Sequence, residues 1–437
     1  MADKNGQDLR QRNVGSSEKE PKEESDRVES VGASPTPSVP KTRKKKLYYV
    51  IWDSVLIPLK RLIQLAIVGL ILYAILKESP IKAVAYTLQD PPTFIGPLAP
   101  NTKLQEGKRI LEGKISGPES LAFYKGNIYT GTYNGEILRI STTDHKIRRL
   151  ARLGVRPCGK PEYEPTCGRP LGIHIDNGHI YVLDAYLGLF EVEDGTGKHE
   201  SLAHNKRTYD AKAVAFANDL AKFSRQDGDF FMTDSSRKWQ RRQFPLALFE
   251  ADNCGRLIWY NPKSSRSNVA LPKLFFPNGI TMSPQEDFLL IVESSRFRIL
   301  KYYIDGPKSG NLEIFADNLP GIPDNITPSS TGGYWVGLAY VGGRMGSYPF
   351  FDFLSDKPWL RNLITKFVSP AKLLSLLPTY GMIIELDQEG LIRRSLHDPT
   401  GEVVGSVSEV LDTGDALYLG SFNAPYLVKV DMRTNKM

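Results

Sequence analysis

The sequence predicts an all-β protein, a six-bladed β-propeller that follows a disordered cytosolic tail and one transmembrane helix. A short phrase in which a polar residue precedes an apolar strand occurs six times, at intervals of roughly 45 to 60 residues with one longer gap, which is the period of propeller blades. Alternating apolar and polar residues with Asn-Gly turns follow the phrase, and long amphipathic helical runs are nearly absent. The six copies occupy residues 117–122, 169–173, 217–220, 277–280, 323–326 and, more weakly, 407–410.

The hairpin pattern is clearest after the first copy of the phrase. One turn separates the apolar run 121–124 from a second run that ends at Thr132. A turn with the dipeptide Asn134-Gly then leads into a third run, 136–140. Period-two runs joined by such turns form antiparallel hairpins. Three or four strands of this kind make one twisted sheet, and six sheets around an axis account for residues 106–437.

The N-terminal region has a different composition. Residues 1–46 are rich in Lys, Glu, Ser, Gln and Pro and almost lack aromatic and branched apolar residues. Such a segment cannot bury a core, so we expect it to be disordered. It ends in the basic cluster 41–46, which is followed by a basic flank and membrane anchor at 47–78 and by a linker at 79–105.

The strongest apolar run in the anchor, 62–76, is 15 residues long, which is shorter than the roughly 20 residues needed to cross a bilayer core. It can be extended back toward Val55 past Lys60 and Arg61, whose long side chains can reach the headgroups. A cleaved signal peptide is not favoured, because it would lie at the extreme N-terminus. A core helix of the globular domain is the alternative.

The charges that flank the anchor predict its orientation. The basic cluster 41–46 precedes it, whereas Lys77 and Glu78 follow it, and this asymmetry predicts a cytosolic N-terminus. We therefore expect a single-pass type II protein whose propeller lies on the lumenal or extracellular side of the endoplasmic reticulum or plasma membrane. The same cluster is suited to contact anionic lipid.

Lys and Arg outnumber Asp and Glu by 56 to 49, but much of this excess lies beside the anchor, so nucleic acid is not an expected partner. A second basic stretch, 237–242, is interpreted as a solvated surface strand. Cys158 and Cys167 bracket a loop rich in Pro, Gly and Glu. In an oxidising compartment a disulfide there would stabilise the fold by about 2–3 kcal/mol, and two free thiols are the alternative. Cys254 is left without a partner.

An insertion at about 345–378 interrupts blade five. It contains an amphipathic helix that begins near Pro358 and whose polar face would carry Arg361 and Lys366. The apolar residues that recur at helical spacing are Trp359, Leu360, Leu363, Ile364, Phe367 and Val368. One interpretation is that this stripe packs on the top of the propeller. The other is a lid over the channel mouth whose exposed part touches membrane lipid.

Four of the six copies of the phrase place Glu, Asn or Asp where an innermost strand would begin: Glu119, Asn218, Asn278, and the pair Asp324 and Asn325. These strand starts converge on the central channel of a propeller, so oxygen atoms from distant parts of the chain would meet there. Carboxylate and amide oxygens are the ligands that Ca²⁺ prefers. The pattern therefore predicts a calcium site on the axis.

At this point the sequence resembles the strictosidine synthase-like propellers, which are related more distantly to paraoxonases and gluconolactonases. The resemblance extends from about residue 50 onward. It implies a type II membrane glycoprotein with weak arylesterase activity. The motifs that carry it are Gly117-Pro-Glu-Ser, Cys167-Gly-Arg-Pro-Leu-Gly-Ile, Thr233-Asp-Ser-Ser-Arg-Lys-Trp-Gln-Arg-Arg, Phe276-Pro-Asn-Gly-Ile, Pro323-Asp-Asn-Ile and Arg394-Ser-Leu-His-Asp-Pro.

Carried over by position, the calcium ligands of paraoxonase-like propellers fall on the residues that the repeat selects: Glu119, Asn218, Asn278, Asp324 and Asn325. Glu119 and Asp324 would be the charged ligands, and in a hydrolase one of these carboxylates would also orient the attacking water. Asn325 is the acceptor of the sequon Asn325-Ile-Thr327, and we expect it to face the channel and to stay unglycosylated.

Three departures from the related families limit this transfer. The paraoxonase histidine that is often assigned as a base is Leu171 here, and His174 should lie further along the strand. The acidic residue that follows the first glutamate in paraoxonases is Ser120, which removes one ligand of their second calcium, although Asp219 matches another. The third departure concerns strictosidine synthases, whose catalytic glutamate aligns with Ser408.

Because Ser408 cannot replace that glutamate, although Glu409 lies beside it, amine–aldehyde condensation is not expected. Two functions remain. The first is a Ca²⁺-dependent hydrolase that acts on a small aryl ester or lactone, with the metal as a Lewis acid. The second is a membrane-anchored binding or scaffold protein in which a structural calcium holds the blades together.

Overall fold

The computed structural model describes residues 49–205, 208–209, 212–225, 228–345 and 349–432. The predicted disordered tail, 1–46, and its basic cluster, 41–46, lie outside these residues. The chain divides into two compact units, 1–72 and 73–437.

The predicted anchor is helical from Tyr49 to Leu76, over 28 residues. Its first part includes a π-helical turn, η1 (Trp52–Leu56), which continues into α2 (Ile57–Leu76). Among the described residues this is the one helix that is long and apolar enough to cross a membrane. None of its apolar window is buried, which argues against the alternative of a core helix.

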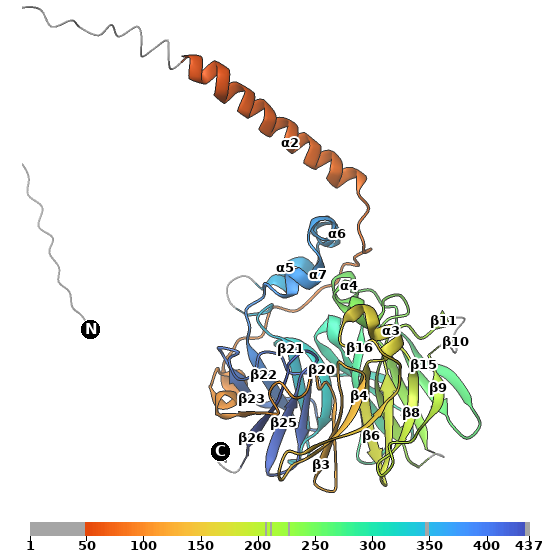
Figure 1. The fold of residues 1–437 in the computed structure, drawn as a ribbon. Helices are drawn as coiled ribbons and strands as arrows, with labels where there is room; N and C mark the ends of the chain where they lie inside the picture. The colour runs from red at the N-terminus through yellow and green to blue at the C-terminus, as the bar shows by residue number, and fades with distance from the viewer. Residues whose placement is uncertain (1–48, 206–207, 210–211, 226–227, 346–348, 433–437) are drawn as a thin grey trace, which may run out of the picture. The chain divides into compact units, whose positions relative to one another are not determined.

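Six four-stranded antiparallel sheets form a propeller, as the repeat predicts (Figure 1). Blade one contains β2 (Leu121–Tyr124), β3 (Asn127–Gly131), β4 (Glu136–Ser141) and β5 (Ile147–Arg152). Blade two contains β6 (Pro170–Asp176), β7 (His179–Asp184), β8 (Gly188–Glu193) and β9 (His199–His204). Blade three contains β12 (Ala217–Phe223), β13 (Asp229–Asp234), β14 (Gly255–Asn261) and β15 (Arg266–Leu274).

The remaining blades have the same order of strands, innermost first. Blade four contains β16 (Pro277–Met282), β17 (Phe288–Glu293), β18 (Arg298–Tyr303) and β19 (Leu312–Ala316). Blade five contains β20 (Ile322–Pro328), β21 (Tyr334–Tyr340), β22 (Gly381–Leu386) and β23 (Ile392–Asp398). Blade six contains β24 (Glu409–Asp412), β25 (Ala416–Gly420), β26 (Leu427–Asp431) and, as its outermost strand, β1 (Lys108–Ile110).

The pairing of β1 with β26 closes the ring, because it joins the first strand of the domain to the last. In this antiparallel pair Arg109 lies opposite Val428. The core consists of apolar clusters between neighbouring sheets, such as the one that joins Leu183 and Leu189 of blade two to Phe230 and Tyr260 of blade three. A ring closed in this way leaves only short, protected inner edges, and the innermost strands stay fixed around the axis.

Four innermost strands contain a break in register at the phrase that the sequence repeats. The breaks separate Pro170 from Ile173, Ala217 from Leu220, Pro277 from Ile280 and Pro323 from Ile326. A β-bulge of this kind redirects side chains locally and ends regular pairing. The repeated polar residues therefore lie at irregular strand starts, where they are not committed to the faces of a sheet.

Two glycines of the phrase allow the innermost strands to approach one another closely. A Cβ atom at Gly172 would lie 2.7 Å from Oδ1 and 2.8 Å from Cα of Asp219, and one at Gly279 would lie 2.4 Å from Cα of Asn325. A side chain at either position would push neighbouring blades apart at the axis. The glycines thus set the width of the channel.

Helices cover one end of the propeller (Figure 1). They are α3 (Glu164–Cys167), α4 (Phe244–Glu250), α5 (Phe350–Ser355), α6 (Pro358–Phe367) and α7 (Pro370–Leu374). The last three belong to the insertion expected at about 345–378. Shorter elements are a two-stranded hairpin of β10 (Thr208–Tyr209) and β11 (Lys212–Ala213), and the 3-10 helices η2 (Gly96–Leu98), η3 (Lys103–Glu106), η4 (Pro161–Tyr163), η5 (Arg241–Gln243) and η6 (Ser294–Arg296).

The predicted disulfide between Cys158 and Cys167 is present, and Cys254 is a free thiol. The bridge closes the connection between blades one and two, which contains η4 and α3. Glu164 of this connection is buried and belongs to the site described below.

We expect the double variant Cys158→Ser and Cys167→Ser to lower the free energy of unfolding by about 2–3 kcal/mol, because the bridge restricts the unfolded chain over a separation of 9 residues. Urea titration monitored by tryptophan fluorescence measures this loss. Cys254→Ser is the control, since it breaks no bridge and should change stability much less. Equal unfolding curves for the double variant and the unchanged chain would contradict the expectation.

Candidate functional site

The polar residues that begin the innermost strands meet around the axis, as the repeat predicts. Glu119, Asn218, Asn278 and Asp324 line one cavity of about 50 Å³. Each of these four side chains is less than a tenth exposed. The fifth predicted residue, Asn325, is buried beside the cavity, where its Nδ2 donates a hydrogen bond to Oε1 of Glu119 at 3.2 Å.

Hydrogen bonds orient the three amides so that their nitrogen atoms are occupied. Nδ2 of Asn278 donates to Oδ1 of Asp324 at 2.5 Å and to Oγ of Ser294 at 3.1 Å. Nδ2 of Asn218 donates to Oγ of Ser235 at 2.8 Å. This arrangement leaves the amide oxygens for another partner.

Several buried oxygens of the site have no hydrogen-bond partner in the described part of the chain: Oε2 of Glu119, Oδ1 of Asn278, Oδ1 of Asn325 and Oε1 of Glu409. A buried acceptor without a partner costs free energy, so this group of oxygens favours a proton or a bound ligand. The five residues predicted from the repeat offer the carboxylates of Glu119 and Asp324 and three amide oxygens, and this set suits Ca²⁺. Within the described residues no three His, Cys, Asp or Glu side chains form a metal cluster by themselves, so the amides are essential to this fit.

Burial raises the pKa of all four carboxyl groups near the axis. The pKa of Glu119 is raised, and burial together with the charge of Glu119 raises that of Asp324 well above its ordinary value. Burial raises the pKa of Asp219 to about 7, and burial and the nearby acids raise that of Glu409 well above its usual range. The site therefore favours either protons or a bound cation.

Arg241 lines the cavity, although its position in the sequence predicted a place at the surface. The stretch 237–242 was interpreted as a solvated surface strand, but it forms a loop that leads into η5, and Arg241 is only 8% exposed. Its Nη1 donates to Oε1 of Glu164 at 2.8 Å, and this carboxylate of α3 is itself buried. The ion pair holds the guanidinium of Arg241 inside the protein. The basic stretch 237–242 does not indicate this in the sequence, because Glu164 lies in a distant segment.

Arg169 supplies the second buried positive charge. Its Nη2 donates to the carbonyl oxygens of Gly117 at 2.9 Å and Phe422 at 3.2 Å. Burial, and then the charge of Arg241, lowers its pKa to about 10. Arg169 begins the second copy of the repeated phrase, so its position in the repeat was the signal that could have identified it. The two guanidinium groups offset part of the negative charge at the axis.

The departures from the related families are located in the structure. Leu171 lines the cavity, and no histidine is among the described residues that do so. His174 lies further along β6, as expected, and burial followed by the charge of Lys222 lowers its pKa to about 4. Nothing in this arrangement gives His174 access to the cavity.

The other residues at which this chain departs from or matches the related families already make hydrogen bonds within the protein. Asp219 accepts hydrogen bonds from the backbone N–H groups of Leu220 at 2.8 Å and Ile280 at 2.9 Å. Ser120 accepts one from Nδ2 of Asn325 at 3.2 Å. Oγ of Ser408 donates to the carbonyl oxygen of Glu119 at 2.7 Å. Asp219 thus braces adjacent blades, and Ser408 positions the backbone of Glu119.

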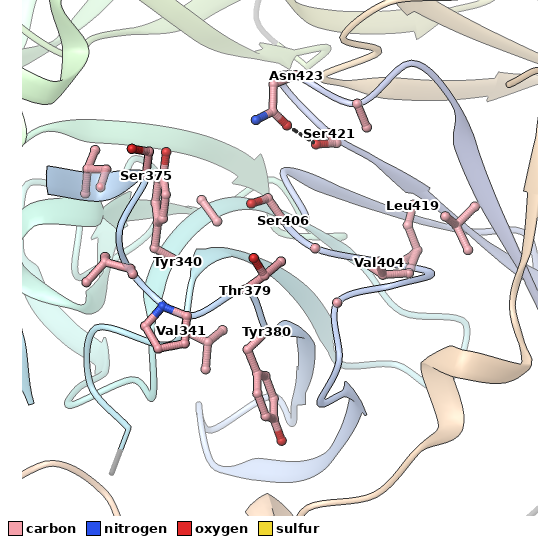
Figure 2. A pocket seen from close by; sticks show the side chains of 18 of the residues that line it. Tyr340, Val341, Ser375, Thr379, Tyr380, Val404, Ser406, Leu419, Ser421 and Asn423 are labelled. Atoms are coloured by element: carbon pink, nitrogen blue, oxygen red, sulfur yellow. Dashed lines mark hydrogen bonds between the residues drawn. The ribbon is translucent and has the colours of Figure 1, made fainter. Parts of the chain in front are cut away.

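A larger cavity of about 420 Å³ adjoins the first, and Ala339 and Tyr340 line both. Figure 2 shows it from close by. All of its lining residues are uncharged, and the hydroxyl groups of Tyr340, Ser375, Thr379 and Ser406 come from its different walls. Burial, and then the charge of Asp324, raises the pKa of Tyr340 to about 12, so this phenol stays protonated. The cavity is suited to an uncharged ligand with several hydrogen-bonding groups.

Asn325 is 1% exposed and lies in β20, one hydrogen bond from Glu119. A glycan on this side chain would not fit inside the channel. The prediction that Asn325 faces the axis thus agrees with its position. Whether the chain carries any glycan, as the family resemblance implies, stays a prediction.

Comparisons with known proteins agree with this architecture. A family model described as "Strictosidine synthase" matches residues 219–307, and one described as "Strictosidine synthase-like, N-terminal" matches residues 96–140. A gluconolactonase structure from Xanthomonas campestris, XC5397, has a TM-score of 0.50 at 16% identity and is covered over 99% of its length by 82% of this chain. That likeness supports the fold alone. The fold is a six-bladed propeller, and the two matched segments are similar to strictosidine synthase and strictosidine synthase-like proteins.

Curated relatives narrow the family. The adipocyte plasma membrane-associated protein of Gallus gallus is 42% identical over 361 residues, which cover 82% of this chain and 86% of the relative. The protein of the same name from Homo sapiens is 41% identical over 360 residues, with 82% and 85% covered. The chain belongs to the adipocyte plasma membrane-associated protein family.

Asp324→Asn separates charge from shape at the site. In chelator at about pH 8 we expect this variant to be more stable than the unchanged chain. Its free energy of unfolding should be about 1 kcal/mol or more higher, because the substitution removes one buried negative charge. The gain should disappear toward about pH 4, since a carboxyl with a raised folded-state pKa destabilises the fold only as pH rises above its unfolded value. Urea titrations across this range measure it. Asp305→Asn, at a half-exposed site, is the control and should show no such pH dependence.

Proposed function

We propose that the protein is a Ca²⁺-dependent hydrolase of uncharged aryl esters or lactones. The observation that carries this proposal is the group of buried, unpartnered oxygens at the axis, which faces a cavity next to a larger uncharged one. The ligands would be the predicted residues Glu119, Asn218, Asn278, Asp324 and Asn325. When bound, Ca²⁺ would supply Lewis-acid polarisation of the substrate carbonyl and stabilise the charge that develops on its oxygen.

The remaining chemistry falls to the side chains of the cavity. Asp324 and Glu119 are the two carboxylates that line it, and one of them would accept the proton of the attacking water. We assign this role to Asp324, because one of its oxygens is held by Asn278 and the group is otherwise open to the cavity. The proton would then pass to the oxygen released when the C–O bond breaks. An aryl ester would give an acid and a phenol, and a lactone would open to one hydroxy acid.

Substrate selection would rest on the larger cavity. Its wall contains no charged side chain, so an ionic substrate would lose its hydration there without compensation. Tyr340 stands between the two cavities and can donate a hydrogen bond to an ester or lactone oxygen. These features support an uncharged carbonyl compound as the substrate class.

Leu171 favours a second function. Since this residue occupies the place of the base in related hydrolases, the same ion could serve only to hold the blades together. The protein would then be a membrane-anchored binding or scaffold protein. Both functions require calcium at the axis, and they differ in whether a substrate turns over.

We further propose a type II topology, with the propeller on the lumenal or extracellular side. The charge asymmetry around the helix Tyr49–Leu76 supports it, as does the disulfide between Cys158 and Cys167, because such bonds persist in oxidising compartments. The names of the relatives refer to association with the plasma membrane. The propeller would therefore work in the endoplasmic reticulum or at the cell surface.

Calcium should stabilise the fold if the axis binds it. We expect Ca²⁺ at 100 times its dissociation constant to add about 2.7 kcal/mol to the free energy of unfolding, and to raise the melting temperature accordingly. Asp324→Ala should greatly reduce this gain, because it removes one of the two charged ligands. Differential scanning fluorimetry with added Ca²⁺ or chelator measures both effects. Identical melting curves for chelated and calcium-loaded protein would contradict the metal site.

Hydrolysis of phenyl acetate by the full chain in detergent micelles distinguishes the two functions. We expect activity with Ca²⁺, loss of activity with chelator, and a fall of at least about 100-fold in kcat/KM for Asp324→Asn and Glu119→Gln. Asp305→Asn is the control and should keep full activity. Calcium-dependent stabilisation without hydrolysis of phenyl acetate or of a δ-lactone would support the scaffold function and overturn the enzymatic one.

A further inference from the structure

Helix α6 of the insertion turns its large apolar side chains outward. Trp359, Leu363 and Phe367, spaced four residues apart, are 64%, 37% and 45% exposed. Arg361 and Thr365 of the same helix are 2% and 5% exposed. Arg361 was predicted on the polar face of an amphipathic helix, but its side chain is buried while Trp359, Leu363 and Phe367 are exposed.

Hydrogen bonds to backbone carbonyls explain why Arg361 is inside. Its Nη1 donates to the carbonyl oxygen of Phe249 at 2.7 Å, and its Nη2 donates to those of Ser355, at 3.2 Å, and Val84. The guanidinium thereby joins α4, α5 and the linker beneath α6. The helix cannot rotate its exposed stripe inward without breaking these bonds.

The packing interpretation holds for part of this helix. Leu360 and Ile364 pack against the main apolar cluster, as the packing interpretation expects. Trp359, Leu363 and Phe367 form a separate stripe on the outside, which we call the outer stripe. A soluble protein rarely leaves three such side chains in a row in water, so the outer stripe is suited to an apolar surface.

Nearby residues extend this surface. Phe353 of α5 and Leu376, which follows α7, are 57% and 66% exposed. Apart from the buried Arg361, residues 349–380 contain three basic side chains, at positions 357, 366 and 372, against acidic ones at 352 and 356. The combination of exposed aromatic and aliphatic residues with an excess of lysine is typical of segments that lie in the headgroup region of a membrane.

The linker holds α6 close to the end of the candidate membrane span. Oγ of Ser79 lies 3.2 Å from Oγ1 of Thr365, and the backbone N–H of Ala83 donates to Oδ1 of Asn362 at 3.0 Å. The helix Tyr49–Leu76 ends three residues before Ser79. Three extended residues span at most about 11 Å, so the chain itself restricts α6 to the neighbourhood of the bilayer.

We propose that the outer stripe of α6 docks on the lipid surface of the membrane that holds the anchor. Lys357 and Lys372 would lie among the lipid headgroups, while Trp359, Leu363 and Phe367 enter the interface between headgroups and acyl chains. The docked helix fixes the end of the propeller that carries α7, whose Leu374 lines the larger cavity. This docking does not depend on the proposed hydrolysis.

The test uses the full chain in phosphatidylcholine–phosphatidylserine vesicles, with acyl chains that are either brominated or not. The contribution of Trp359 is the emission of the unchanged chain minus that of Trp359→Phe, which removes the common signal of Trp52 in the span. We expect this difference to be strongly quenched by brominated lipid and little affected by aqueous iodide. Leu363→Glu should reverse both results, because a charged residue would lift the stripe from the interface.

Trp259→Phe provides the matched control. Trp259 lies in β14, where its ring nitrogen donates to Oδ2 of Asp229 at 2.7 Å, so its difference signal should not respond to brominated lipid. Quenching of Trp359 by iodide but not by brominated lipid would place the outer stripe in water and overturn the proposal. Protection from both quenchers would also overturn it, in favour of a second copy of the chain or another protein on the stripe.

Discussion

Negative charge buried at the axis of the propeller is the constraint on which the rest of the site depends. Four buried carboxyl groups lie near the axis, those of Glu119, Asp219, Asp324 and Glu409. The positive charges of Arg169 and Arg241 act on Glu119, but Arg241 is already paired with Glu164. Burial therefore raises the pKa of each acid. The free energy of unfolding then depends on whether protons or a cation neutralise these carboxyl groups. A cation at the axis would relieve this repulsion and hold strands of several blades together at once.

The architecture produces this concentration of charge with a simple backbone device. The bulges in β12, β16 and β20 free polar residues from the regular faces of their strands, and the ring of blades points these residues toward the axis. Gly172 and Gly279 let neighbouring strands come close enough for their side chains to share a cavity. The repeat that builds the propeller is thus also the repeat that builds the site.

The insertion in blade five connects two parts of the molecule that the repeat does not describe. Its α6 carries the outer stripe, and its α7 contributes to the uncharged cavity beside the axis. The linker 79–105 is fastened to the same helix by Ser79 and Ala83. The outer stripe, the larger cavity and the linker are therefore connected through a few short elements at one end of the propeller.

The sequence by itself determined the six blades, the apolar helix and the disulfide between Cys158 and Cys167, because each depends on a local pattern. It also placed five polar residues near the axis, since they recur at the same position of the repeat: Glu119, Asn218, Asn278, Asp324 and Asn325. Only the tertiary structure decided where Arg241 and Arg361 lie. From the sequence both would be expected at the surface, because an arginine in a sequence does not indicate which buried group will pair with it. Their burial depends on Glu164 and on carbonyl groups that come from distant segments, and such contacts exist only once the blades and helices have packed.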